Sequence, residues 1–145
     1  MINAAVSYKS IADARTLLAS ALHKRYKMTI VEKGELYYVD FGVPRGSEQG
    51  GYRPVVIVQN DVGNITSPTT IVAPLTSQPK RYLPTHVAVD NEGLRTTSIV
   101  LAEQIQTIDK SRLINYLGKL DEKQIEEIDR AMSTALDIKY ERNQS

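Results

Sequence analysis

Residues 51–59 read Gly-Tyr-Arg-Pro-Val-Val-Ile-Val-Gln, and this run decides the fold of the chain. Its apolar part, residues 54–59, is too short for a helix and rich in β-branched side chains, so it predicts a central β-strand. Pro54 opens that strand, where the missing N–H of proline does least harm to a sheet. Arg53 is therefore expected at the mouth of a buried strand, with its guanidinium facing the polar loop that precedes it.

Short strands broken by turn residues flank this run on both sides. We expect strands at residues 35–41, 69–76, 86–89 and 98–105, with Pro74 marking an edge or a bulge. Residues 42–51, 60–68 and 77–83 are expected to form loops, residues 91–93 a turn, and residues 109–116 a short helical or irregular connection. About five short strands in close succession predict a mainly β fold, built as a small, curled, antiparallel barrel.

Helices are predicted near both ends of the chain. Residues 10–27 have an amphipathic pattern with Ser10 as N-cap, so we expect an N-terminal helical extension over residues 1–29. Asp121 and Gln124 form a capping-box pattern at the start of a C-terminal helix. The apolar stripe of that helix consists of Ile125, Ile128, Met132, Ala135 and Leu136. The main domain is then expected over residues 30–139, followed by a polar tail at residues 140–145.

Composition excludes several classes of site. The chain has no cysteine, which rules out disulfides and thiolate chemistry, and its two histidines, His23 and His86, are far apart, so we expect no metal site. No apolar stretch approaches the roughly 20 residues that span a bilayer, and we expect a cytoplasmic protein. The net charge is +1, but residues 1–30 carry five Lys or Arg against one acid. That asymmetry fits either a basic face for a polyanion or ordinary solvated charge.

Arg53 is the residue best placed for chemistry. A guanidinium held by the end of a rigid strand can bond two phosphate oxygens at once. The structural alternative is a salt bridge from Arg53 to Glu48 or Asp61. Gly50 and Gly51 favour the anion-binding hypothesis, because glycines remove side chains where a ligand backbone must approach closely.

The sequence also resembles a known family. Residues 46–61, Gly-Ser-Glu-Gln-Gly-Gly-Tyr-Arg-Pro-Val-Val-Ile-Val-Gln-Asn-Asp, resemble the signature of the MazF/PemK toxins of Gram-positive bacteria. The resemblance continues in collinear order through residues 67–69 (Ser-Pro-Thr), 71–76 (Ile-Val-Ala-Pro-Leu-Thr), 83–87 (Leu-Pro-Thr-His-Val), 103–110 (Glu-Gln-Ile-Gln-Thr-Ile-Asp-Lys) and 112–113 (Arg-Leu). It covers roughly residues 30–138, so it is far more specific than any one motif, and it leaves residues 1–29 outside.

This resemblance implies a fold, an activity and partners. The fold would be a compact SH3-like barrel of the PemK/CcdB type that forms a homodimer. The activity would be that of an mRNA interferase: sequence-specific, ribosome-independent cleavage of single-stranded RNA without metal or other cofactor. A small cognate antitoxin, MazE-like, would neutralise the toxin by placing its flexible C-terminal segment in the RNA groove.

The resemblance also implies which residues act. The catalytic arginine and threonine of the family fall on Arg53 and Thr76. RNA carries its own nucleophile in the 2′-OH, so the enzyme has to orient that group and stabilise the charge that develops on phosphorus. Arg53 would stabilise the phosphorane oxygens and help protonate the leaving 5′-oxygen, while Thr76 would hydrogen-bond a phosphoryl oxygen or the 2′-OH. The expected products are a 2′,3′-cyclic phosphate, or its 3′-phosphate hydrolysis product, and a 5′-hydroxyl.

The general base and the groove are less closely defined. Some family members carry a histidine in the first loop, where this chain has Ser-Glu-Gln, so Glu48 is the local candidate base. Alternatively, Glu48 orients Arg53 or reads a base edge. Residues expected to line the RNA groove are Ser47, Gln49, Gly50, Ser77, Gln78, Lys80, Arg81, Glu103 and Gln104. His86 is expected to have a structural role, because a lone histidine is a weak signal.

Two other functions fit the same fold. One is a non-enzymatic toxin that poisons a protein target such as DNA gyrase, and the other is an SH3-like module that only binds RNA or peptide. The pair of Arg53 and Thr76 beside a basic groove favours the ribonuclease, because a protein-binding toxin has no need of it.

Overall fold

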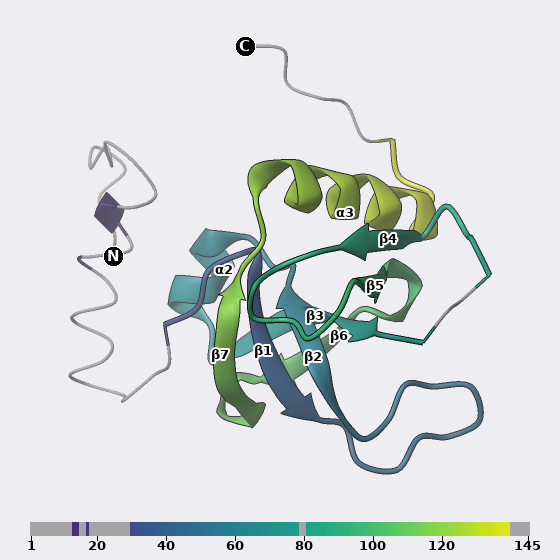
Figure 1. Cartoon of the computed structure of the whole chain (residues 1–145). Helices are drawn as coiled ribbons and strands as arrows, with labels where there is room; N and C mark the ends of the chain where they lie inside the picture. The colour runs from purple at the N-terminus through teal and green to yellow at the C-terminus, as the bar shows by residue number, and fades with distance from the viewer. Residues whose placement is uncertain (1–12, 15–16, 18–29, 79–80, 140–145) are drawn as a thin grey trace.

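The computed structural model describes residues 13–14, 17, 30–78 and 81–139 of the chain (Figure 1). The helix expected over residues 10–27 therefore lies almost wholly outside the described residues, and so do Lys80 and the expected tail at residues 140–145. Helical backbone is seen at residues 13, 14 and 17.

The described part of the chain is mainly β. Its strands are β1 (Glu35–Asp40), β2 (Tyr52–Ile57), β3 (Thr69–Thr76), β4 (His86–Val89), β5 (Ser98–Leu101), β6 (Gln106–Asp109) and β7 (Leu113–Lys119). The helices are α2 (Asp61–Thr66) and α3 (Glu122–Ala135), and two short 3₁₀ turns, η1 (Ala102–Gln104) and η2 (Lys110–Arg112), flank β6. All strand pairs are antiparallel.

The strands form one curled sheet in the order β4-β5-β3-β2-β1-β7, with β6 also paired to β3. The predicted mainly β fold with a C-terminal helix is confirmed, but the sheet does not close into a barrel: within the described residues no ladder joins β4 to β7. The gap is bridged instead by the turn that follows β4, which we call the seam turn (residues 90–93). Asn91 Nδ2 donates to the Lys119 carbonyl at 2.9 Å, and Gly93 lies so close to the backbone of Leu117 that a Cβ would meet its oxygen at 1.9 Å.

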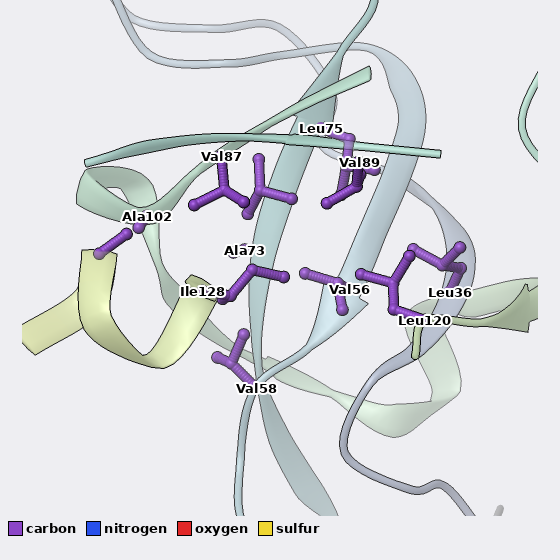
Figure 2. Packing of buried hydrophobic residues seen from close by; sticks show 12 residues of the cluster. Leu36, Val56, Val58, Ala73, Leu75, Val87, Val89, Ala102, Leu120 and Ile128 are labelled. Atoms are coloured by element: carbon purple, nitrogen blue, oxygen red, sulfur yellow. The ribbon is translucent and has the colours of Figure 1, made fainter. Parts of the chain in front are cut away.

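The sheet is buried on both faces, which is why β2 reads as a continuous apolar run. One core contains Leu36, Val56 and Leu75 and is covered by α3 through Ile128 and Ala131 (Figures 1 and 2). The alternate side chains of the same strands face the other way, into a second core that the curling of β6 and β7 covers. Its buried members are Val31, Tyr37, Val39, Val55, Ile57, Val72 and Ile108.

Several predicted elements differ from the structure. Residues 60–68, expected as a loop, contain the helix α2, because the Asn60 side chain caps it by accepting from the Gly63 N–H. The strand expected over residues 98–105 ends at Leu101, and residues 109–116, expected as an irregular or helical connection, hold the η2 turn and the start of β7. Pro74 lies within an interior strand, at the point where β3 changes partner from β6, which pairs up to Val72, to β5, which pairs from Leu75. A proline is tolerated there because it lies between the ladders with β6 and β5 and belongs to neither, while on its other side it pairs with Val55 of β2.

Candidate active site

The sheet register brings Arg53 and Thr76 onto one row. Strands β2 and β3 pair Val55 with Pro74 and Val56 with Ala73. Extending this register by two residues places Arg53 opposite Thr76, and both side chains fall on the same face of the sheet. The two predicted catalytic residues are therefore cross-strand neighbours at the end of a rigid sheet.

Two backbone carbonyls hold the Arg53 guanidinium. Its Nε donates to the Gly50 carbonyl at 2.9 Å, and its Nη1 donates to the Leu75 carbonyl at 3.3 Å. Among the described residues no carboxylate pairs with Arg53, so the salt bridge to Glu48 or Asp61 is not formed; Asp61 instead accepts from the Lys33 N–H at 2.8 Å. A guanidinium has five N–H donors, so Nη2 remains for an anion.

Burial of Arg53 also favours binding of an anion at Nη2. Arg53 is half-buried, and the resulting desolvation lowers the pKa of its guanidinium below its ordinary value. The group stays cationic at neutral pH, because arginine pKa values are far above it. A partly desolvated cation whose partners are neutral carbonyls is stabilised by a bound phosphate.

Thr76 ends β3 and is 6% exposed. Its Oγ1 accepts a hydrogen bond from the Gln78 N–H at 3.2 Å, which leaves the hydroxyl proton free to be donated. The hydroxyl is thus fixed by the backbone that follows it, on the same row as the free edge of Arg53.

The conformation of the loop itself requires the two glycines beside Arg53, a reason that the sequence analysis did not give. A Cβ on Gly50 would meet Pro44 Cδ at 2.4 Å, so glycine is needed where the loop folds back on itself. Gly51 has φ +74°, and its N–H and carbonyl bond to Gly42 and Phe41 across the loop base. The loop conformation also places the Gly50 carbonyl where it accepts the hydrogen bond from Arg53 Nε.

A concave pocket of about 450 Å³ adjoins this row. We call it the loop pocket, and two segments that are far apart in sequence line it. The lining residues are Arg45, Ser47, Glu48, Gln49, Glu103, Gln104, Ile105 and Gln106. The Gln49 N–H donates to Gln104 Oε1 at 3.2 Å and ties the two segments together. Five of the predicted site residues, Glu48 among them, thus meet in one pocket, next to the glycine that holds Arg53.

His86 has the structural role expected of it, with one addition. Its Nε2 lies 2.9 Å from Glu103 Oε1, while its Nδ1 is buried without a hydrogen-bond partner among the described residues. The contact holds the Glu103 carboxylate, a member of the loop pocket, in place.

The other predicted groove residues are more dispersed. Ser77, Gln78 and Arg81 are exposed on the segment that follows β3, and Lys80 lies outside the described residues. The structure does not bring Gln78 or Arg81 into the loop pocket, and Ser77 faces a second pocket described below. Arg45 and Gln106 also line the loop pocket, although the sequence analysis does not name them as site residues. The sequence feature that points to Arg45 is its positive charge within residues 42–51, which we call the glycine loop.

No other class of site is evident in the part of the chain that the structure describes. No group of three or more His, Cys, Asp and Glu side chains there could hold a metal ion, and no helix is long and apolar enough to cross a membrane. A site of one arginine, one threonine and paired carboxylate and amide side chains suits recognition of a phosphodiester and its bases.

Comparisons with known proteins agree with this geometry. Residues 32–136 match the family described as "PemK-like, MazF-like toxin of type II toxin-antitoxin system". The chain is 46% identical over 110 residues to Endoribonuclease EndoA of Bacillus subtilis (strain 168), across 74% of this chain and 95% of that protein. Among solved structures it is similar to an endoribonuclease from a mycobacterial species (TM-score 0.65, 27% identity, 79% of this chain and 98% of that one). It is equally similar to a mycobacterial endoribonuclease in complex with its cognate antitoxin (TM-score 0.65, 29% identity, 77% of this chain and 99% of that one).

Proposed function

Because the chain belongs to the family of PemK-like and MazF-like toxins of type II toxin–antitoxin systems, we propose that it is a sequence-specific endoribonuclease that cleaves single-stranded RNA. The observation that carries this proposal is the half-buried Arg53, held by two carbonyls and without a carboxylate partner among the described residues. The relative from Bacillus subtilis and the mycobacterial structures are named endoribonucleases. They favour an enzyme over the gyrase-poisoning and RNA- or peptide-binding alternatives.

In the proposed reaction the 2′-oxygen attacks the adjacent phosphorus while the bond from phosphorus to the 5′-oxygen breaks. The products are a 2′,3′-cyclic phosphate and a 5′-hydroxyl, so one proton leaves the 2′-OH and one reaches the 5′-oxygen. Arg53 stabilises the non-bridging oxygens through Nη2 and helps to protonate the leaving 5′-oxygen, and Thr76 donates a hydrogen bond from its hydroxyl to a phosphoryl oxygen. Glu48, at the wall of the loop pocket, is the proposed acceptor of the 2′-OH proton.

We place RNA binding on both sides of this row. Ser47, Gln49 and Gly50 belong to the glycine loop, Glu103 and Gln104 to the opposite wall of the loop pocket, and Ser77, Gln78, Lys80 and Arg81 to the segment after β3. Amide and carboxylate side chains in the pocket suit hydrogen bonds to base edges, whereas the cations suit phosphates.

The remaining parts of the proposal concern assembly. We infer that residues 30–139 form the toxin domain, that it acts as a homodimer in the cytoplasm, and that a cognate antitoxin blocks the RNA site. Support for the antitoxin comes from the mycobacterial relative, whose structure contains its cognate antitoxin.

Incubating the purified full chain with long single-stranded RNA in EDTA tests the activity. Mapping the new 5′ ends should give discrete cuts that bear 5′-hydroxyls. Arg53→Ala should abolish cleavage while the protein remains folded, whereas Arg130→Ala, which changes an exposed arginine on α3, should cleave as the wild type does. Intact RNA with the antitoxin-free wild type would contradict the proposal, and cleavage by Arg53→Ala would remove Arg53 from the mechanism.

A further inference from the structure

A second pocket, of about 180 Å³, lies on the other face of the same strand ends. It is lined by Tyr38, Tyr52, Leu75, Ser77 and Arg95 among others, and we call it the tyrosine pocket. Successive side chains of a strand point to opposite faces. Tyr52 therefore faces away from Arg53, and Ser77 away from Thr76.

Tyr52 forms an exposed aromatic platform in this pocket. Its ring stacks on Tyr38 with 4.9 Å between the centroids and 19° between the planes. In the register of β1 and β2, Tyr52 pairs with Asp40 and Pro54 pairs with Tyr38, so the two rings are diagonal neighbours on one face. The stack fixes the orientation of Tyr52, yet Tyr52 stays 55% exposed. A rigid, exposed ring is the kind of surface on which unpaired bases stack.

The tyrosine pocket is also continuous with the catalytic row. Tyr52 directly precedes Arg53 and Ser77 directly follows Thr76, so their Cα atoms are about 3.8 Å apart. Leu75 joins the two sites, because its carbonyl accepts from Arg53 while its side chain lines the pocket. A nucleotide adjacent to a phosphate held by Arg53 is therefore within reach of Tyr52.

The charge and size of the pocket fit a nucleotide. Arg95 is exposed at its rim, and none of the described residues that line it is acidic. The volume is smaller than the roughly 300–1,000 Å³ of pockets for drug-sized ligands, which suits a single ring system. Ser77, Thr96 and Ser98 add hydroxyl groups to a wall whose apolar part is formed by Pro54, Leu75 and Leu94.

We propose that the tyrosine pocket binds the base of the nucleotide next to the scissile phosphate, with Tyr52 as the stacking partner and Arg95 as a phosphate contact. This inference rests on the proposed ribonuclease function. Tyr52 would then contribute to substrate binding from the face of the sheet opposite Arg53 and Thr76. The base of the neighbouring nucleotide would lie on that face.

The test is a double-mutant cycle between protein and RNA. Binding of a short RNA with a 2′-deoxy scissile nucleotide is measured for the wild type, Tyr52→Phe and Tyr52→Val, where valine keeps the preference for a strand. The same measurement is repeated with an abasic nucleotide on either side of the scissile phosphate. We expect Tyr52→Val to weaken binding by roughly 5- to 150-fold and Tyr52→Phe to bind nearly as the wild type does. With the abasic nucleotide on one side, the difference between wild type and Tyr52→Val should vanish.

The outcomes separate this inference from the proposed function. Equal binding by wild type and Tyr52→Val, or a loss that no abasic nucleotide removes, would overturn the stacking subsite. If Tyr52→Val changes self-association in sedimentation while RNA affinity stays constant, the pocket is a contact between copies of the chain and the inference is wrong. If no RNA is cleaved at all, the proposed function fails, and the same cycle run with a random-sequence RNA still decides whether Tyr52 stacks on a base.

Discussion

Arg53 combines a fixed position with an unsatisfied charge. The Gly50 and Leu75 carbonyls determine where the guanidinium lies, and desolvation by its half-buried site lowers the pKa of the group without neutralising it. Lysine has the charge, but its three N–H donors are on one nitrogen, so it lacks the planar fork that here uses different nitrogens for the two carbonyls and the anion.

Arg53→Lys is therefore expected to fold normally and to lose at least about 100-fold in kcat/KM for RNA cleavage, as expected when a directed donor to the developing charge is removed. Steady-state cleavage of a fluorogenic oligonucleotide measures the loss, and thermal unfolding checks the fold. Activity within tenfold of the wild type would show that charge alone is sufficient.

Thr76 offers a nearly isosteric test of its hydroxyl. Thr76→Val keeps the β-branch of this buried strand residue but leaves the Gln78 N–H without its acceptor, so the free energy of unfolding should fall by about 1 kcal/mol. Cleavage should fall by about 100-fold, because a donor to the phosphoryl group is lost. Thr76→Ser, which keeps the hydroxyl, should retain most of the activity; equal losses in both variants would point to packing instead.

Lys110 gives a pH dependence with a defined sign. It is 4% exposed, its Nζ donates to the Asn64 carbonyl, and burial lowers the pKa of its amine below 10.5. The unfolded state therefore binds more protons than the folded state between the lowered pKa and 10.5, and stability rises with pH across that window. Relative to Lys110→Met, which cannot titrate, the wild type should gain unfolding free energy as pH is raised towards 10.5. Urea titrations at several alkaline pH values measure this difference; a constant or falling one would contradict it.

Among the helices and strands, those with a regular pattern of apolar residues could be predicted from the sequence. The α3 stripe is long and regular, and its cap at Asp121 predicts the observed start of the helix. The apolar run predicts β2 two residues too late at each end, because the strand begins at Tyr52 and Pro54 is its third residue rather than its first. Strand β7 was missed because its pairing with β1 shifts register twice, which breaks the alternation of buried and exposed residues. Helix α2, with six residues, is too short to show a helical period and depends on the Asn60 cap.

The candidate site divides in the same way. Arg53 stands out from its place beside the β2 run, whereas Thr76 follows from the family resemblance, and the register that makes the two neighbours is known only from the structure. The loop pocket joins residues 45–49 to residues 103–106, and that contact depends on the curl of the whole sheet. Arg45 and Gln106 were therefore beyond what local patterns can show.

Gly93 is predicted to be indispensable to the seam turn. A Cβ there would lie 1.9 Å from the Leu117 carbonyl oxygen, a backbone atom that cannot rotate away. Gly93→Ala should reduce the free energy of unfolding by about 1–3 kcal/mol, as for other overpacked sites. Gly46→Asn is the matched control: its φ is +56° with no atom within 4 Å of the added Cβ, and asparagine tolerates that conformation. Differential scanning calorimetry of both variants measures the contrast, and equal transitions would refute the tight contact.

At the scale of the molecule, the proposed RNA path crosses one end of the sheet and uses both of its faces. Gly50 links the row of Arg53 and Thr76 to the loop pocket, and the tyrosine pocket lies on the opposite face. The exposed Arg95 lines the tyrosine pocket, and the exposed Arg81 belongs to the segment that follows β3. Phosphate contacts of this kind make affinity depend on salt, because bound counterions are released.

Arg81→Gln should accordingly reduce the slope of log affinity against log salt by about 0.7, the value for one phosphate contact on a single strand. Arg130→Gln on α3, remote from the proposed path, should leave the slope unchanged. Fluorescence anisotropy over a range of KCl concentrations gives both slopes. An unchanged slope for Arg81→Gln would place Arg81 away from the RNA.

The seam turn also has a consequence for the rate of unfolding. Strand β7 pairs with β1, and the ion pair between Lys119 and Glu32 at this edge joins residues 87 positions apart. This edge of the sheet is therefore assembled from distant parts of the chain. Interactions that form only after the transition state change the unfolding rate and leave the folding rate nearly constant. We expect the contacts of the seam turn to belong to this class, because they bridge a sheet that other strand pairs assemble. Asn91→Ala, which removes the bond to Lys119, should therefore accelerate unfolding in stopped-flow experiments and leave the refolding rate almost unchanged. The seam turn, which bridges the open sheet, would then determine how long the native state persists before it unfolds.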